Sequence, residues 1–119
     1  MLTDALQLAH KDTVDARDIG LLIRKARDKR GWKQEALAHD VGCSAAYITN
    51  LERGHMVPTV EMSIKLEQSL TLHAGTLSAL VVKHRIQQAV ATILRESTDL
   101  GVDTRVRLSF MDDAVPKRN

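Results

Sequence analysis

The fold is decided by residues 31–54, which read GWKQEALAHDVGCSAAYITNLERG. Glycines at both ends and at Gly42 divide this stretch into two short runs of residues that favour helices. The first run predicts a helix over residues 34–40, and the second predicts a helix that Ser44 caps and that continues through Glu52. Two short helices joined by a turn at a glycine have the arrangement of a helix-turn-helix.

Helices are also predicted on both sides of this stretch. The apolar residues at positions 19, 22, 23 and 26 follow the i, i+3, i+4, i+7 spacing of one helix face, and Gly31 ends that helix. On the other side, Thr59 is expected to cap a helix that runs to about Leu70. A longer helix is expected over residues 77–97.

This long helix has two apolar stripes instead of one. A helix that is apolar on two sides in so small a protein is expected to pack on its own domain and on a second surface. After it, residues 104–110 alternate between apolar and polar, which is the pattern of a β-strand, and a lone strand needs a partner. We therefore predict a homodimer built by residues 76–110. Its expected interface comprises Val82, Ile86, Val90, Ile93, Val106, Leu108 and Phe110.

The composition of the 119 residues is 44% hydrophobic, 27% charged and only 3% aromatic, which suits a small helical domain. The one cysteine, Cys43, excludes an internal disulfide framework and a cysteine-rich zinc site, and we expect neither a metal nor a cofactor. No apolar run approaches the roughly 18 residues of a membrane span. Residues 1–10 lack the basic leader and apolar segment of a secretory signal, so a cytoplasmic protein without a membrane partner is expected.

The expected fold is all-α: a helix-turn-helix bundle of four to five helices, followed by a long C-terminal helix and one short β-strand. We divide the chain into an N-terminal arm over residues 1–17, a helix-turn-helix domain over residues 18–75, and a C-terminal segment over residues 76–119 with the dimerisation helix, the strand and a loose tail. The formal net charge is +2, yet six basic residues and one acidic residue stand within positions 24–33. Such a run attracts phosphate where a nucleic-acid-binding motif adjoins it.

Several short motifs stand at fixed distances from one another along the chain. They are Ile19-Gly20, Arg27, Gln34-Glu35-Ala36-Leu37-Ala38, Gly42, Leu51-Glu52-Arg53-Gly54, Pro58-Thr59, and Leu66 with Leu70. In these residues the chain resembles the lambda-repressor-like, Xre-type family of helix-turn-helix transcription regulators. The resemblance covers about residues 19–70 and implies binding of double-stranded DNA, with the helix over residues 44–52 in the major groove.

The resemblance also assigns roles to individual positions. Helical spacing agrees with it, because Ile48 and Leu51 point one way and Thr49 and Asn50 the other. The family pairs an arginine of its first helix with the glutamate that ends the recognition helix, here Arg27 and Glu52, to which we assign a structural role. The expected DNA contacts are Gln34 and Lys33 at phosphates, Ser44, Tyr47 and Arg53 at the backbone, and Ala45, Ala46, Thr49 and Asn50 at bases.

The chain departs from the family pattern in three places. Lys33 stands where the family often has a capping threonine, so the cap of the following helix is expected to be weak. Ala45 and Ala46 replace polar residues and can touch only thymine methyl groups, so that hydrogen-bonded base reading is expected to rest on Thr49 and Asn50. In the fourth helix, two polar residues replace buried apolar ones, and we expect something polar, such as the N-terminal arm, to cover them. These two residues are Ser63 and Glu67.

The predicted function is that of a sequence-specific DNA-binding transcription regulator, a repressor that binds a palindromic operator as a dimer. One alternative stays open: an antitoxin or anti-repressor-type module whose segment 76–119 binds another protein. An enzyme is not expected, because the chain has no glycine-rich phosphate loop, nucleophile elbow or set of metal ligands. Cyanases also place a helix-turn-helix-like bundle before a catalytic domain, but no cyanase motif can be matched to this chain.

Overall fold

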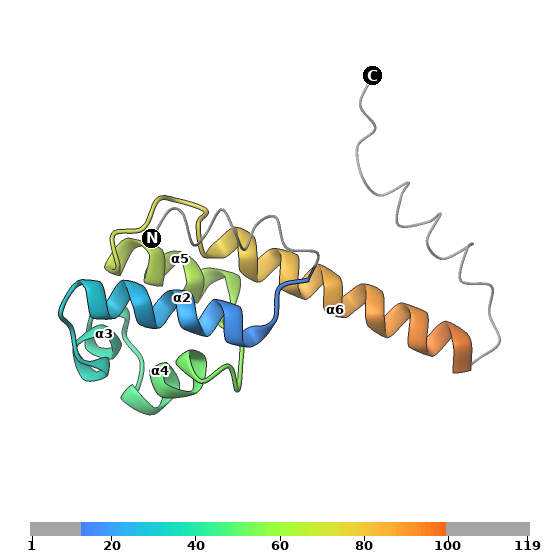
Figure 1. The fold of residues 1–119 in the computed structure, drawn as a ribbon, viewed down its shortest axis with the longest axis horizontal. Helices are drawn as coiled ribbons and strands as arrows, with labels where there is room; N and C mark the ends of the chain where they lie inside the picture. The colour runs from blue at the N-terminus through green and yellow to red at the C-terminus, as the bar shows by residue number, and fades with distance from the viewer. Residues whose placement is uncertain (1–12, 100–119) are drawn as a thin grey trace, which may run out of the picture. The chain divides into compact units, whose positions relative to one another are not determined.

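A computed structural model describes residues 13–99 of the chain, which form five α-helices and, within that range, no strand. They are α2 (Ala16–Lys29), α3 (Gln34–Val41), α4 (Ala45–Glu52), α5 (Val60–Ser69) and α6 (Ser78–Asp99) (Figure 1). The prediction of a helical fold is confirmed for this part of the chain. The strand expected over residues 104–110, most of the N-terminal arm and the tail lie outside the described residues.

The predicted capping residues stand at the N-terminal ends of α4 and α5. Ser44 Oγ accepts the backbone N–H of Tyr47 at 3.1 Å, and Thr59 Oγ1 accepts that of Met62 at 3.1 Å. Lys33 precedes α3 and gives it no side-chain cap, as expected for a lysine at this position. These three helices therefore begin where the sequence predicts.

The helix α2 begins at Ala16, earlier than the apolar spacing from Ile19 onward predicts. Its N-cap is Asp15, whose carboxylate accepts the backbone N–H of Asp18 at 2.9 Å. In return the carboxylate of Asp18 accepts the backbone N–H of Asp15 at 3.1 Å, which completes a capping box. The signal for this start is present in the sequence as two carboxylates three residues apart in front of an apolar stripe.

The turn between α3 and α4 depends on Gly42, which has a left-handed backbone with φ of 77°. Just after it, the backbone N–H of Cys43 bonds to the carbonyl of Ala38 at 2.9 Å and closes the C-terminal end of α3. A side chain would be strained at this φ, so glycine allows the chain to leave α3 and enter α4 at once. In the resulting arrangement α4 packs against α2 and α3, and α3 also packs against α5 (Figure 1).

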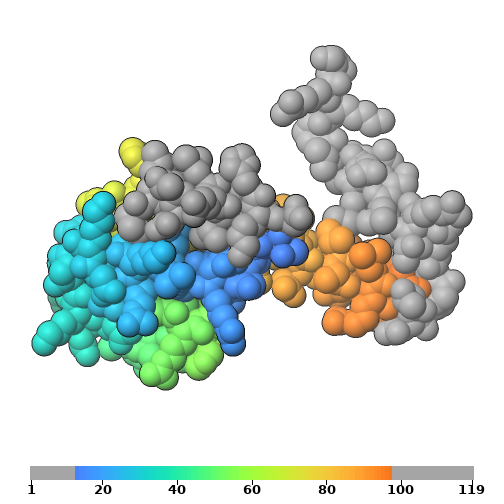
Figure 2. All heavy atoms as spheres, in the orientation of Figure 1, coloured from blue at the N-terminus to red at the C-terminus, as the bar shows by residue number. Residues whose placement is uncertain are grey.

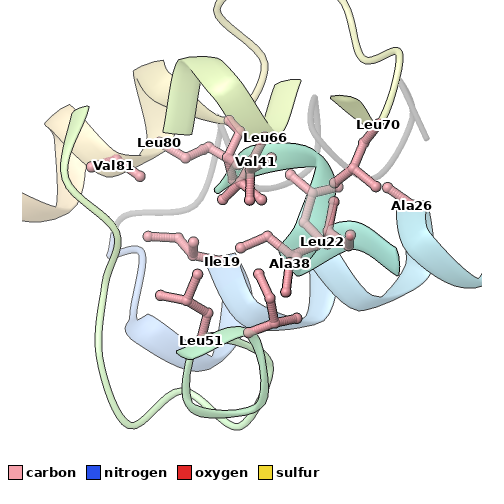
Figure 3. Packing of buried hydrophobic residues seen from close by; sticks show 14 of the residues in the cluster. Ile19, Leu22, Ala26, Ala38, Val41, Leu51, Leu66, Leu70, Leu80 and Val81 are labelled. Carbon is pink, nitrogen blue, oxygen red and sulfur yellow. The ribbon is translucent and has the colours of Figure 1, made fainter. Parts of the chain in front are cut away.

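The core lies between the five helices, whose apolar side chains point toward one another in Figure 3. Leu37, Ile48 and Leu66, one each from α3, α4 and α5, are fully buried. The chain divides at Arg85 into two compact units, and the whole core belongs to the first, together with the first two turns of α6. The core residues are Val14, Ile19, Leu22, Ile23, Ala26, Leu37, Ala38, Val41, Ile48, Leu51, Leu66, Leu70, Leu77, Leu80 and Val81.

The two polar residues of α5, Ser63 and Glu67, are buried and hydrogen-bonded inside the protein. Glu67 Oε2 accepts the backbone N–H groups of Leu77 and Ser78 at 2.7 and 2.6 Å, and the Ser78 hydroxyl at 2.9 Å. Ser63 Oγ donates to the carbonyl of Val60 at 2.6 Å. The free N–H groups and the partial positive charge at the start of a helix both favour a carboxylate. The polar group that we expect to cover Glu67 is therefore the start of α6.

A buried ion pair joins α2 to the last residue of α4. Arg27 Nε and Nη2 donate to the two carboxylate oxygens of Glu52 at 2.6 and 2.9 Å. The third donor, Arg27 Nη1, bonds to the carbonyl of Trp32 at 2.6 Å. The two charged side chains are only 10% and 4% exposed. The hydrogen bond with Glu52 raises the pKa of Arg27, so the guanidinium stays charged. Because the ion pair is bidentate, it fixes the relative orientation of the two side chains as well as the distance between them.

The backbones of α2 and α4 meet at Gly20. A Cβ at this position would lie 2.8 Å from the carbonyl oxygen of Glu52 and even closer to that of Leu51. Glycine inside a helix normally costs about 1 kcal/mol relative to alanine. Here its missing side chain allows the close approach that brings α4 within reach of Arg27.

We predict that Gly20→Ala lowers the free energy of unfolding by about 1–3 kcal/mol, the usual cost of overpacking. Without the contact, alanine would instead stabilise the helix. The control is Leu21→Ala at the neighbouring position, where the side chain is 49% exposed and the change should stay within about 0.5 kcal/mol. Urea unfolding of both variants measures the difference. A Gly20→Ala protein at least as stable as the parent would contradict the prediction.

We predict that Glu52→Gln lowers the free energy of unfolding by about 3 kcal/mol, because it leaves a buried guanidinium without its counter-charge. The matched control is Asp28→Asn, which removes a carboxylate that is 60% exposed and lies 3.3 Å from Arg27 Nη1. An exposed ion pair contributes about 1 kcal/mol at most. Equal losses of the free energy of unfolding in the two variants would show that the buried pair with Glu52 stabilises the protein no more than the exposed pair with Asp28 does.

Candidate nucleic-acid interface

The helix α4 turns an apolar face to the core and a mixed face to the surface. Ile48 and Leu51 are fully buried, whereas Ala46 is exposed, and Thr49 and Asn50 are partly exposed. Figure 1 shows α4 beside α2 and α3, and the green segment at the end of α4 reaches the molecular surface in Figure 2. Of the side chains that the sequence assigns to base reading, Ala46, Thr49 and Asn50 thus belong to the outward side of this helix, whereas Ala45 is partly buried and packs against the core.

A chain of hydrogen bonds links α4 to the start of α3. Thr49 Oγ1 lies 2.7 Å from Gln34 Oε1 and 3.1 Å from the carbonyl oxygen of Ala45, and it can donate its single proton to either atom. Gln34 Nε2 donates to Glu52 Oε1 at 3.1 Å, and Glu52 in turn accepts from Arg27. Gln34 therefore braces α4 from α3. In the described part of the chain this uses one of its two amide N–H groups, which leaves the other for a phosphate oxygen.

A recess of about 300 Å³ opens beside these hydrogen bonds. Arg27 and Glu52 form their buried pair in its lining, and two exposed arginines, Arg24 and Arg53, stand beside them. Because Glu52 neutralises Arg27, the two exposed guanidinium groups give the recess a net positive charge. The full lining is Arg24, Arg27, Gln34, Thr49, Glu52 and Arg53.

Sequence reasoning missed Arg24 as a member of this site. Its signal is its position in α2, three residues before Arg27, so that both side chains fall on the same side of the helix. The basic run over residues 24–33 includes Arg24, but a charge run alone does not show which of its members faces the DNA-binding helix.

The other expected phosphate contacts stand at the ends of α3 and α4. Lys33, Ser44 and Arg53 are exposed, and each flanks one of these two helices. Tyr47, in the first turn of α4, is partly buried, and burial raises its pKa. Its phenol is therefore protonated at neutral pH and can donate a hydrogen bond to a phosphate oxygen. The role of each of these residues in DNA binding stays a prediction.

Cys43, in the turn before α4, is a partly buried free thiol. Burial raises its pKa, which keeps it protonated and poorly nucleophilic at neutral pH. His39 lies one turn earlier on α3, and within residues 13–99 no three His, Cys, Asp or Glu side chains are grouped in a way that could hold a metal ion. Over the same range, none of the helices has the length and apolar character needed to cross a membrane.

The residues assigned to the dimer interface are described only in part. Val82 and Ile86 of α6 are 40% and 55% exposed, and Val90 and Ile93 are half-buried. The other three residues of the predicted interface, Val106, Leu108 and Phe110, lie outside the described residues.

Comparison with known protein families gives a match over residues 23–77 to a family model described as helix-turn-helix, of the lambda-repressor-like, Xre type. The match spans the second half of α2, all of α3, α4 and α5, and the whole connection into α6. Neither the curated proteins nor the solved structures contain a match to the chain. Residues 23–77 therefore match a helix-turn-helix domain, and this kind of domain has the fold of DNA-binding transcription regulators.

Proposed function

We propose that the protein is a sequence-specific transcription regulator that binds double-stranded DNA and represses by occupying a promoter. The observation that carries this proposal is the outward face of α4, which holds Thr49 and Asn50 beside a recess with two exposed arginines. A helix of this family enters the major groove and contacts base edges there. The family match supports DNA binding as the general activity.

In this proposal, one side chain reads bases and a separate set of side chains contacts phosphates. Asn50 hydrogen-bonds a base edge, since an amide can pair with adenine in the major groove. Lys33, Gln34 and Arg53 hold phosphates on either side of α4, and they set the register of the helix without reading sequence. The buried pair of Arg27 and Glu52 holds α4 at a fixed angle to the rest of the bundle.

The active form in this proposal is a homodimer, because one helix-turn-helix covers only half of an operator. Two-fold pairing places two recognition helices about 34 Å apart on successive turns of the major groove, on a palindromic site. The exposed Val82 and Ile86 support a second surface on α6. They would equally serve a different protein bound to the segment 76–119, as in an antitoxin-type module, and the oligomeric state distinguishes the two.

We predict that DNA binding weakens with salt, with a slope of log affinity on log salt of about −0.9 for each phosphate contact. The measurement uses a site selected from random DNA. Asn50→Ala should relax the preference at one or two base pairs by about 1–3 kcal/mol, whereas Lys33→Ala should weaken all sequences alike and reduce the slope by about 1. The control is Lys65→Ala, which removes an exposed lysine from α5. If Asn50→Ala leaves every position of the selected site unchanged, the assignment of Asn50 is wrong.

We predict that the intact chain sediments as a dimer at micromolar concentration and that Ile86→Glu makes it a monomer. A point substitution is used in place of a deletion of residues 76–119, because such a deletion would also remove core residues of the first unit. These are Leu77, Leu80 and Val81. The matched control is Ile64→Glu, which places the same charge at an apolar residue of α5 that is 42% exposed and should leave the dimer intact. A monomeric parent, or a dimer that persists in Ile86→Glu, would contradict the proposed interface.

A further inference from the structure

The hydroxyl proton of Thr49 is engaged inside the protein. The hydroxyl has a single proton, and its two acceptors are Gln34 Oε1 at 2.7 Å and the carbonyl of Ala45 at 3.1 Å, both part of the same domain. If the hydroxyl turned outward to donate to a base, Gln34 Oε1 would lose this partner. The loss of a partly buried hydrogen bond is costly, so the inward arrangement is the favoured one.

The remaining outward groups of α4 next to Thr49 are methyl groups. Ala46 carries nothing else, and with its hydroxyl proton bonded inside the domain Thr49 is left with its methyl group as well. Ala45 also carries only a methyl group, but it is partly buried against the core. Position 46 is three residues before position 49, which places the two side chains next to each other on one helix face. Asn50 carries the one amide among the four positions expected to read bases.

We infer that α4 recognises thymine through methyl contacts, and that Thr49 reads with its methyl group and not by donating its hydroxyl proton to a base. This inference rests on the proposed function and names the chemical group that the recognition helix reads. In the major groove the C5-methyl of thymine is the apolar group among the donors and acceptors of the base edges, and an apolar helix face is complementary to it. The hydrogen bond to Gln34 occupies the hydroxyl proton of Thr49, which leaves the methyl group of Thr49 for contact with a base.

Deoxyuridine is the matched probe for this inference. It differs from thymidine only in lacking the C5-methyl, so base pairing and every hydrogen-bonding group of the base edge are kept. In the site selected from random DNA, each thymine is replaced in turn by deoxyuridine and the affinity of the full chain is measured at constant salt. We expect one to three positions per half-site to lose affinity by about fourfold each, the factor that burial of one methyl group contributes. Thymines outside the site should show no change.

Two variants separate the methyl group of Thr49 from its hydroxyl. Thr49→Ser keeps the hydroxyl and removes the methyl, so one thymine position should become indifferent to deoxyuridine. Thr49→Val keeps a methyl and removes the hydroxyl, so that position should keep its preference for thymine even if overall affinity falls through the loss of the bond to Gln34. Thermal unfolding of both proteins confirms that they remain folded.

The outcomes distinguish the inference from the function on which it rests. A protein that binds a selected site with the expected salt dependence but shows no sensitivity to deoxyuridine retains the proposed function and overturns the inference. The inference is also overturned if Thr49→Ser keeps the thymine preference that Thr49→Val loses, since the hydroxyl would then be the reader. A protein that selects no DNA site at all overturns both.

Discussion

Arg27 reaches from α2 to the last residue of α4 and places a charged guanidinium against a carboxylate that is only 4% exposed. A carboxylate with so little access to water needs donors on both oxygens, and Glu52 receives two from Arg27 and one from Gln34. These donors come from α2 and α3, so three helices are tied together at one group. Gly20 allows this arrangement, because it removes the side chain at the point where the backbones of α2 and α4 meet.

The position of Glu52 is unfavourable in isolation. It ends α4, where the partial negative charge of the helix opposes a carboxylate. Glu67 shows the opposite case, since its carboxylate meets the N-terminal end of α6 and is stabilised there by free N–H groups. Without Arg27, the negative end of α4 and the burial of Glu52 would both work against the fold. Removal of the guanidinium alone would therefore leave a buried, uncompensated carboxylate at this corner of the domain.

Local signals in the sequence account for most of the secondary structure. Ser44 and Thr59 act as caps through their own hydroxyls and backbone groups three residues away, so the helix starts are encoded in adjacent residues. The pair of Arg27 and Glu52 could be expected only through the resemblance, because 25 residues separate the two side chains. The partner of Glu67 could not be expected, since it consists of backbone N–H groups that any residue supplies. The recess that Arg24 lines could not be predicted from the sequence either, because it exists only where three helices meet.

The helix α4 has eight residues, too few to be stable as an isolated helix in water. Its geometry therefore comes from its surroundings: the buried Ile48 and Leu51 on one side, and the hydrogen bonds of Gln34 and Glu52 on the other. The same bonds that hold α4 in place also engage polar groups that would otherwise be available to DNA. On α4, the group engaged in this way is the hydroxyl proton of Thr49. In the proposed complex, α4 therefore presents the amide of Asn50 together with methyl surface, and the exposed arginines beside it attract the phosphates.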